Sequence, residues 1–199
     1  SENNWQIYYN MKSKKMVIVS APSGAGKTTI VKYIIENVPQ LQFSISACSR
    51  EKRHNEIDGK DYYFISAEDF KNKIANDEFV EWEEVYEDKF YGTLKSELER
   101  IWSLQKYVIF DVDVKGGVNI KKMYGDDALS LFIMPPSLEI LEERLRNRKT
   151  NSEDDIVQRV EKAEYELTFK EQFDRIIIND DLNVAQNEAL NAVKDFLEQ

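Results

Sequence analysis

The stretch MVIVSAPSGAGKTT, residues 16–29, decides the fold of this chain. It opens on an apolar run, and a glycine-containing loop follows that ends in Lys27 and Thr28. The apolar residues in the next segment, 30–38, recur at helical spacing. A strand, such a loop and a helix in direct succession are typical of the phosphate-binding P-loop. The stretch therefore predicts a nucleotide-binding α/β core.

The chemistry of this loop follows from its residue types. Its glycines let backbone N–H groups turn toward phosphate oxygens, and the start of the helix adds partial positive charge. Lys27 can reach the terminal phosphates of ATP, and the Thr28 hydroxyl can bind Mg²⁺. The usual pattern opens with glycine, where this chain has alanine, a residue small enough to be tolerated. We expect the phosphates to contact Ala21, Pro22, Ser23, Gly24, Ala25, Gly26, Lys27, Thr28 and Thr29.

Composition limits the class of protein. With 199 residues, 42% of them hydrophobic, the chain can bury a sizeable core. Its net charge of −10 argues against a general nucleic-acid surface. The single Cys48 excludes an intrachain disulfide and fits a reducing compartment, so we expect a cytoplasmic protein. We expect no membrane segment and no signal peptide, because the chain lacks a run of about 18 apolar residues and its start lacks a basic region followed by an apolar one.

Strands and helices alternate in the first and last thirds of the chain. Short apolar runs at 16–20, 107–112, 129–134 and 174–178 predict strands, and helices are expected at 26–38, 114–124 and near the C-terminus. Such strands predict a parallel sheet covered by helices on both faces. In the last helix, the residues expected to face inward are Val184, Leu190, Val193 and Leu197.

Two segments interrupt this core. Residues 44–96 read as short, partly alternating strands near 43–48, 62–65, 79–85 and 89–91, with one helix capped by Ser66, which predicts a small mixed-sheet insert packed in part by Trp82. Residues 137–167 read as two helices joined by the polar segment 149–151, the second capped by Ser152 with Asp155. The predicted organisation is an N-terminal extension (1–15), a core (16–43, 97–136 and 168–199), the insert and a helical lid.

Several arginines lie where phosphoryl transfer needs positive charge. Arg144 and Arg148 share a helix face of the lid, and Arg159 comes from its second helix. They could close over a transferring phosphoryl group, or they could form surface pairs with neighbouring glutamates. In the insert, Arg50 and Arg53 lie three residues apart and could grip one phosphate through forked hydrogen bonds.

The combination of motifs resembles the guanylate kinase family from residue 16 onward. After the P-loop come, in the family's order, Ser44-Ile45-Ser46, Arg50, Arg53, Glu56, Gly59-Lys60-Asp61-Tyr62-Tyr63-Phe64, Phe79-Val80-Glu81-Trp82, Phe90-Tyr91-Gly92-Thr93, Asp111-Val112-Asp113-Val114-Lys115-Gly116, Pro135-Pro136-Ser137, Arg144-Leu145, Arg148 and Ile178-Asn179-Asp180-Asp181. The resemblance implies a P-loop kinase core with a GMP-binding insert and a lid. It also implies transfer of the γ-phosphoryl group of ATP to GMP, with dGMP a further acceptor.

The resemblance assigns roles to single residues. The GMP phosphate would be held by Arg50, Arg53, Tyr62 and Tyr91, and the guanine would be read by Ser46, Glu81, Thr93 and Asp113. Lys27, Arg50, Arg148 and Arg159 would act in catalysis, and Asn179 would lie near the ATP adenine. A carboxylate such as Glu81 can accept from guanine N1–H and the exocyclic amine together, whereas adenine would leave it unpaired.

The chain departs from the family pattern at Lys52, Asn55, Lys115 and Lys149. Asp111 is consistent both with a supporting position near Mg²⁺ and with a structural one, and Asp181 is expected to cap the last helix. Two alternatives remain: a non-catalytic scaffold of the same fold, and a P-loop kinase for another small phosphate. Lys27 argues against the first, and Glu81 with Ser46 and Thr93 against the second.

Overall fold

The computed structural model describes residues 14–148 and 152–199. They form two compact units: a core unit of residues 15–41 and 109–199, and a small unit that includes residues 42–108. Most of the predicted N-terminal extension and the polar joint at 149–151 lie outside the described residues. The predicted bounds of the core, insert and lid stay predictions.

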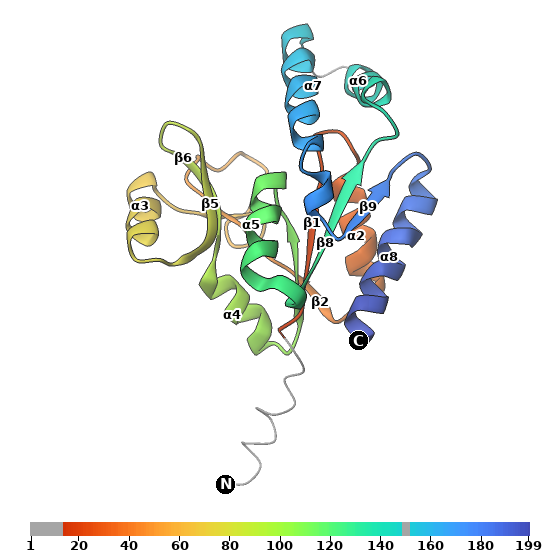
Figure 1. The fold of residues 1–199 in the computed structure, drawn as a ribbon. Coiled ribbons are helices and arrows are strands. Elements are labelled where there is room, and N and C mark those ends of the chain that lie inside the picture. Colours follow the sequence, from red (N-terminus) through yellow and green to blue (C-terminus); the bar gives the residue numbers. More distant parts are fainter. Residues whose placement is uncertain (1–13, 149–151) are drawn as a thin grey trace. The chain divides into compact units, whose positions relative to one another are not determined.

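The core unit is built on a five-stranded sheet in the order β2-β7-β1-β8-β9 (Figure 1). Strands β1 and β8 pair in parallel, as do β8 and β9. The boundary between the two units falls within β2 and β7. The bounds of the strands are β1 Met16–Ser20, β2 Leu41–Phe43, β7 Tyr107–Asp111, β8 Ala128–Met134 and β9 Arg175–Ile178.

Helices cover both faces of this sheet (Figure 1). All five residues of β1 and the first six of β8 are buried, which requires cover on each side. Helix α5 (Val114–Tyr124) packs on β1 and β8, and α2 (Lys27–Asn37) contacts α8 (Leu182–Glu198). Two short 3₁₀ helices, η1 (Gly125–Asp127) and η2 (Lys170–Gln172), complete the connections. The predicted α/β fold with a parallel sheet is confirmed.

Two details of the core differ from the prediction. Val184 was expected to face inward, yet 62% of its surface is exposed, because Ala185, Ala189 and Val193 supply the buried face of α8. Strand β2 has only three residues and was not predicted, since a run so short carries no period of its own. Asp181 caps α8 as expected, because its Oδ1 accepts from the Val184 N–H at 3.0 Å.

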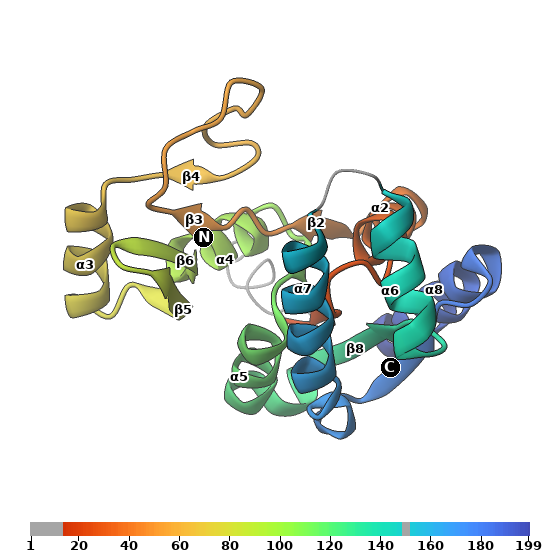
Figure 2. The ribbon, with the colours of Figure 1, turned by 90° about the horizontal axis from the view of Figure 1, so that it is seen from above.

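Helices α6 (Leu138–Asn147) and α7 (Glu153–Leu167) pack against each other (Figure 2). Their shared cluster contains Leu141, Leu145, Ile156 and Ala163. Ser152 and Asp155 form the predicted capping box at the start of α7, each side chain accepting from the other residue's backbone N–H. The two predicted helices of this segment are confirmed.

The small unit has a four-stranded mixed sheet in the order β4-β3-β6-β5. Strand β3 is parallel to β4 and antiparallel to β6, and β6 is antiparallel to β5. Phe70 from α3 stacks on Phe79 and Phe90, with ring centroids at 4.2 and 5.1 Å. The elements are β3 Ala47–Cys48, β4 Tyr63–Phe64, α3 Ala67–Ala75, β5 Phe79–Tyr86, β6 Lys89–Leu94 and α4 Lys95–Ser103.

Two features of the small unit were not predicted correctly. Helix α4 was missed, because it follows β6 without a break and lacks a capping side chain at Leu94. Trp82 was expected to pack the insert, and its ring does contact Phe90 with centroids 6.2 Å apart, but 47% of its surface is exposed on β5. The Ser66 cap is confirmed, since its Oγ accepts from the Asp69 N–H at 3.0 Å.

Candidate active site

The loop between β1 and α2 has the backbone conformation of an anion cradle. Gly24 and Gly26 both have positive φ, +89° and +88°, which disfavours any residue with a Cβ. At Gly26 a Cβ would also clash with Asn179 Nδ2. Helix α2 begins at Lys27, so its first unpaired N–H groups open toward the loop. The predicted P-loop geometry is therefore present in the fold.

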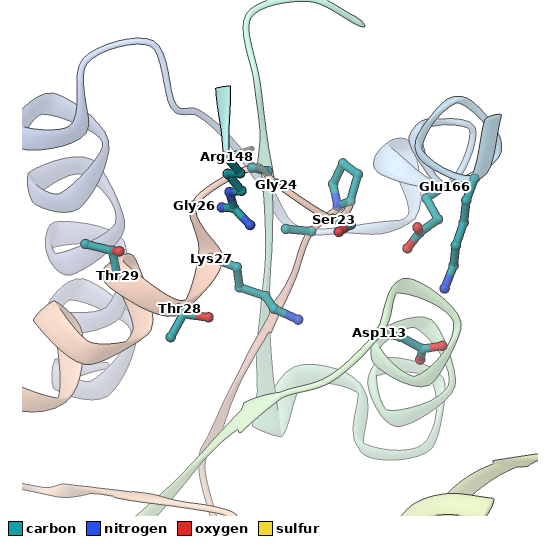
Figure 3. Close-up of a pocket in the computed structure, with 13 residues that line it drawn as sticks. Ser23, Gly24, Gly26, Lys27, Thr28, Thr29, Asp113, Arg148 and Glu166 are labelled. Carbon is teal, nitrogen blue, oxygen red and sulfur yellow. The ribbon is translucent and has the colours of Figure 1, made fainter. Parts of the chain in front are cut away.

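A cavity of about 410 Å³ lies over this loop, within the core unit (Figure 3). Its volume is in the range of small-molecule sites. All nine predicted loop residues line it, and four side chains from other elements join them. The lining residues are Ala21, Pro22, Ser23, Gly24, Ala25, Gly26, Lys27, Thr28, Thr29, Asp113, Arg148, Lys162 and Glu166.

Lys27 lies at the centre of the cavity (Figure 3). Its Nζ pairs with Asp111 Oδ1 at 2.5 Å and donates to the Val112 carbonyl oxygen at 3.3 Å. Both side chains of the pair are about one-fifth exposed. Asp111 thus holds Lys27 at the end of β7. The sequence left the role of Asp111 open, and in this structure its contact is a structural one.

The arginines of the lid segment divide into different environments. Arg148 lines the cavity as predicted, whereas Arg159 is not among the described residues that line it. Arg144 is partly buried and donates from Nη1 to the Asn179 carbonyl oxygen at 2.9 Å. Arg146 forms surface pairs with Glu142 and Glu153. Of the three lid arginines that the sequence predicted near the phosphates (Arg144, Arg148 and Arg159), Arg148 is therefore the one that lines the cavity among the described residues.

Asn179 connects β9 to the P-loop. Its side chain is buried, and Nδ2 donates to the Ala25 carbonyl oxygen at 2.8 Å. Its own carbonyl oxygen accepts from Arg144 Nη1. The predicted contact with adenine stays a prediction, and the structure adds a contact that positions the loop itself.

Arg50 is the centre of a polar cluster in the small unit. Its Nε donates to the Tyr91 hydroxyl at 3.0 Å, and Nη1 and Nη2 donate to the two oxygens of Glu56 at 2.7 and 2.6 Å. The guanidinium also lies 5.1 Å from the centroid of the Tyr62 ring. Hydrogen bonds from Arg50 lower the pKa of Glu56 to about 2, so the pair stays ionised at any working pH.

This cluster changes the predicted use of Arg50. A further bond from Nη1 reaches the Glu51 carbonyl oxygen, so four of the five guanidinium N–H groups are engaged and one on Nη2 remains. Arg53 has an exposed side chain, and its backbone N–H donates to Glu56 at 2.8 Å. In this conformation the two arginines do not form the forked phosphate grip that their spacing suggested.

Glu81 and Thr93 lie opposite each other on β5 and β6. The Thr93 hydroxyl, fully buried, donates to Glu81 Oε1 at 2.9 Å. Directly before β3, the Ser46 carbonyl oxygen accepts from the Tyr63 N–H at 2.9 Å. Two of the predicted base-reading residues are thus in direct contact, which orients the Glu81 carboxylate.

Glu97 on α4 supports this part of the small unit and was missed from the sequence. It is 2% exposed, and it accepts from the Ile45 N–H, the Tyr63 hydroxyl and Arg100. Burial works against its charge, but these hydrogen bonds together lower the pKa of Glu97. A buried anion with several donors fixes the segment that carries Ser46.

A sequence model of the family described as guanylate kinase matches residues 13–199. The chain belongs to the guanylate kinase family. Two curated relatives bear the same name: one from Bacteroides fragilis is 52% identical over 92% of this chain and 90% of its own length, and one from Porphyromonas gingivalis is 50% identical over 92% and 98%.

The fold agrees with this membership in the guanylate kinase family. A crystal structure described as guanylate kinase from Anaplasma phagocytophilum superposes with a TM-score of 0.71 at 27% identity, over 92% of this chain and 86% of that one. None of the helices in the described part of the chain has the length and apolar character that a membrane crossing requires.

Departures from the guanylate kinase pattern have structural partners here. Lys52 Nζ donates to the Glu56 carbonyl oxygen at 3.0 Å, which braces the loop where the family usually has proline. Lys115 lies 5.4 Å from the centroid of the Tyr165 ring, linking α5 to α7. Lys149 lies outside the described residues.

Lys162 and Glu166 also line the cavity, and neither was predicted from the sequence. They follow Arg159 on α7 by three and seven residues, a spacing that places all three on one helix face. That periodicity could have indicated them. Burial raises the pKa of Glu166, and the nearby Asp113 carboxylate raises it further, while Lys162 and Lys27 lower it.

Proposed function

We propose that the chain transfers the γ-phosphoryl group of ATP to GMP, giving ADP and GDP, with the donor held in the core unit and the acceptor in the small unit. The chain is an ATP:GMP phosphotransferase, in keeping with its family and its curated relatives. One observation carries the assignment of the donor: an intact P-loop with Lys27 inside a cavity large enough for a nucleotide's phosphates.

The donor side uses the P-loop and its surrounding cations. Backbone N–H groups of residues 24–29 would bind the β- and γ-phosphate oxygens, and Lys27 would leave Asp111 for the γ-phosphate. Arg148 would stabilise the charge that spreads over the transferring group. Arg159 would reach this group only if the lid segment moves, and Asn179 would lie near the adenine.

The acceptor side uses the polar cluster of the small unit. Tyr62, Tyr91, Arg53 and the remaining N–H of Arg50 would hold the GMP phosphate. Glu81, oriented by Thr93, would accept from guanine N1–H and the exocyclic amine, with Ser46 as a further base contact. These residues would contact the base and the phosphate and not the sugar, so we expect dGMP to be accepted as well. Asp113 lies in the core unit and lines the donor cavity, so its predicted contact with guanine stays a prediction.

Mg²⁺ fits the donor cavity as an ion bound mainly by ATP and water. Within residues 14–148 and 152–199, no three His, Cys, Asp or Glu side chains are grouped so that they could cage a metal. Mg²⁺ usually keeps several waters and uses substrate phosphates as ligands, so such a cage is not required. The Thr28 hydroxyl would contribute the protein ligand, and the ion would neutralise phosphate charge.

A coupled assay with ATP tests the function. The enzyme is offered GMP, AMP, CMP and UMP at equal concentrations, and ADP formation is followed. We expect GMP to be preferred over AMP in kcat/KM by roughly 10⁴-fold, because adenine lacks the N1–H and exocyclic amine donors that guanine would offer to the Glu81 carboxylate. Efficient turnover of AMP without turnover of GMP would contradict the proposed acceptor.

Glu81→Gln tests the base contact directly. The amide offers one acceptor oxygen where guanine presents two donors, so kcat/KM for GMP should fall roughly 10- to 100-fold. The KM for ATP should stay within about twofold, because the donor residues are untouched. Steady-state kinetics with each substrate varied measures both effects.

The matched control is Glu87→Gln, which removes the same charge from an exposed residue between β5 and β6. Its kinetics should equal those of the unmodified enzyme. Unchanged GMP affinity in Glu81→Gln would assign base reading to another residue.

A further inference from the structure

Glu166 is a buried carboxylate at the phosphate cradle. It lies near the end of α7, is 7% exposed, and lines the same cavity as the P-loop (Figure 3). Acidic side chains are unexpected here, because the cavity should receive the most negative part of a nucleotide.

The carboxylate has no hydrogen-bond donor in the part of the chain that the structure describes. Its electrostatic neighbours are Lys162 and Lys27, which favour its charge, and Asp113, which opposes it. Lys27 is already paired with Asp111, and one oxygen of Asp113 accepts from the Gly116 N–H at 2.7 Å. The carboxylate opens into the cavity without a donor from the described residues of its own chain, so it can accept hydrogen bonds from donors that a ligand brings.

The ligand's own chemistry limits what those donors can be. Phosphate oxygens only accept at neutral pH and would repel Glu166. The donors that accompany ATP into such a cavity are water molecules bound to Mg²⁺, since this ion keeps part of its hydration shell. Water polarised by a divalent cation is a strong donor, and a carboxylate is its best acceptor.

We propose that Glu166 is a positioning residue that accepts hydrogen bonds from water bound to the Mg²⁺ of Mg·ATP. The inference rests on the proposed binding of ATP by the P-loop, and it assigns to Glu166 no direct bond to the metal. Thr28 on α2 and Glu166 on α7 would then hold the hydrated ion from two elements of the core unit.

This role has a thermodynamic signature. Without Mg²⁺, the Glu166 charge repels the ATP phosphates and weakens binding. With Mg²⁺, the same charge binds the hydrated ion and strengthens binding. Glu166 therefore couples the binding of ATP to the binding of Mg²⁺. Because such coupling is reciprocal, Mg²⁺ must raise the affinity for ATP by the same factor by which ATP raises the affinity for Mg²⁺.

Calorimetric titration of ATP into the full chain tests the proposal, once with EDTA and once with saturating Mg²⁺. Glu166→Gln keeps the shape and removes the charge. We expect it to bind metal-free ATP severalfold more tightly and Mg·ATP severalfold more weakly, so that the gain in affinity from Mg²⁺ falls by about 10-fold or more. Glu164→Gln, an exposed neighbour on the same helix, should leave both affinities unchanged.

Other outcomes overturn the inference. An equal change in ATP affinity with and without Mg²⁺ would make Glu166 a purely structural residue of α7. If Glu166→Gln does not fold, Glu166→Asp retains the charge at a shorter reach and should give an intermediate loss of Mg²⁺ dependence, whereas unchanged dependence would contradict the proposal. The proposed function is tested separately by the rate of GMP phosphorylation in the unmodified enzyme. If that rate is normal, a negative result for Glu166 leaves the proposed function intact. If the unmodified enzyme does not phosphorylate GMP, the proposed function itself is refuted.

Discussion

Lys27→Ala should lower kcat for GMP phosphorylation by about 10³-fold, because it removes the cation that follows the γ-phosphoryl group through transfer. GMP binding should change less than about twofold, since the acceptor residues lie in the small unit. A coupled assay gives kcat, and calorimetric titration of GMP gives the affinity. The loss also leaves Asp111 without its cation, so the melting temperature should be recorded.

Lys32→Ala is the matched control for this variant. Lys32 lies on the same helix, is largely exposed and makes a surface pair with Glu36 at 3.9 Å. Exposed pairs of this kind contribute little, so activity and stability should stay unchanged. A Lys27→Ala enzyme with more than a tenth of normal kcat would show that Arg148 and the loop backbone suffice.

Arg50→Ala should weaken GMP binding by roughly 100-fold, because it removes one phosphate donor and also the group that orients Tyr91 and Glu56. The Glu56 carboxylate, no longer neutralised, would then face the phosphate of GMP. ATP binding should be unaffected. Calorimetric titration of each nucleotide separates these effects.

Arg50→Lys distinguishes charge from geometry. A lysine retains the charge but cannot bind Tyr91 and both oxygens of Glu56 at once, so we expect an intermediate loss of GMP affinity. Arg175→Ala, at an exposed position on β9, is the control and should bind GMP normally. Full GMP affinity in Arg50→Ala would remove Arg50 from the acceptor site.

The sequence predicted the parts of the fold that local patterns determine. The P-loop, the apolar strands of the core and the caps at Ser66 and Ser152 each depend on residues close together in the chain, and each is confirmed. Strand β2 and helix α4 were missed, because a three-residue strand and an uncapped helix carry little local signal. Their positions depend on partners distant in sequence.

The candidate site shows the same limit. The spacing of Arg50 and Arg53 predicted a phosphate-binding pair, but it could not show that Glu56 forms an ion pair with the Arg50 guanidinium. Glu166 had no motif of its own, and its position at the cavity depends on how α7 packs in the core unit. Partners fixed by tertiary packing are visible only in the folded chain.

The contacts of Asn179 bear on the entropy of nucleotide binding. A glycine-rich loop has many conformations in isolation, and fixing them when a ligand arrives would reduce affinity. The bonds from Asn179 to Ala25 and from Arg144 to Asn179 restrict the loop before any ligand is present. Asn179→Ala should therefore make ATP binding less favourable in entropy, although no direct contact with a phosphate is lost.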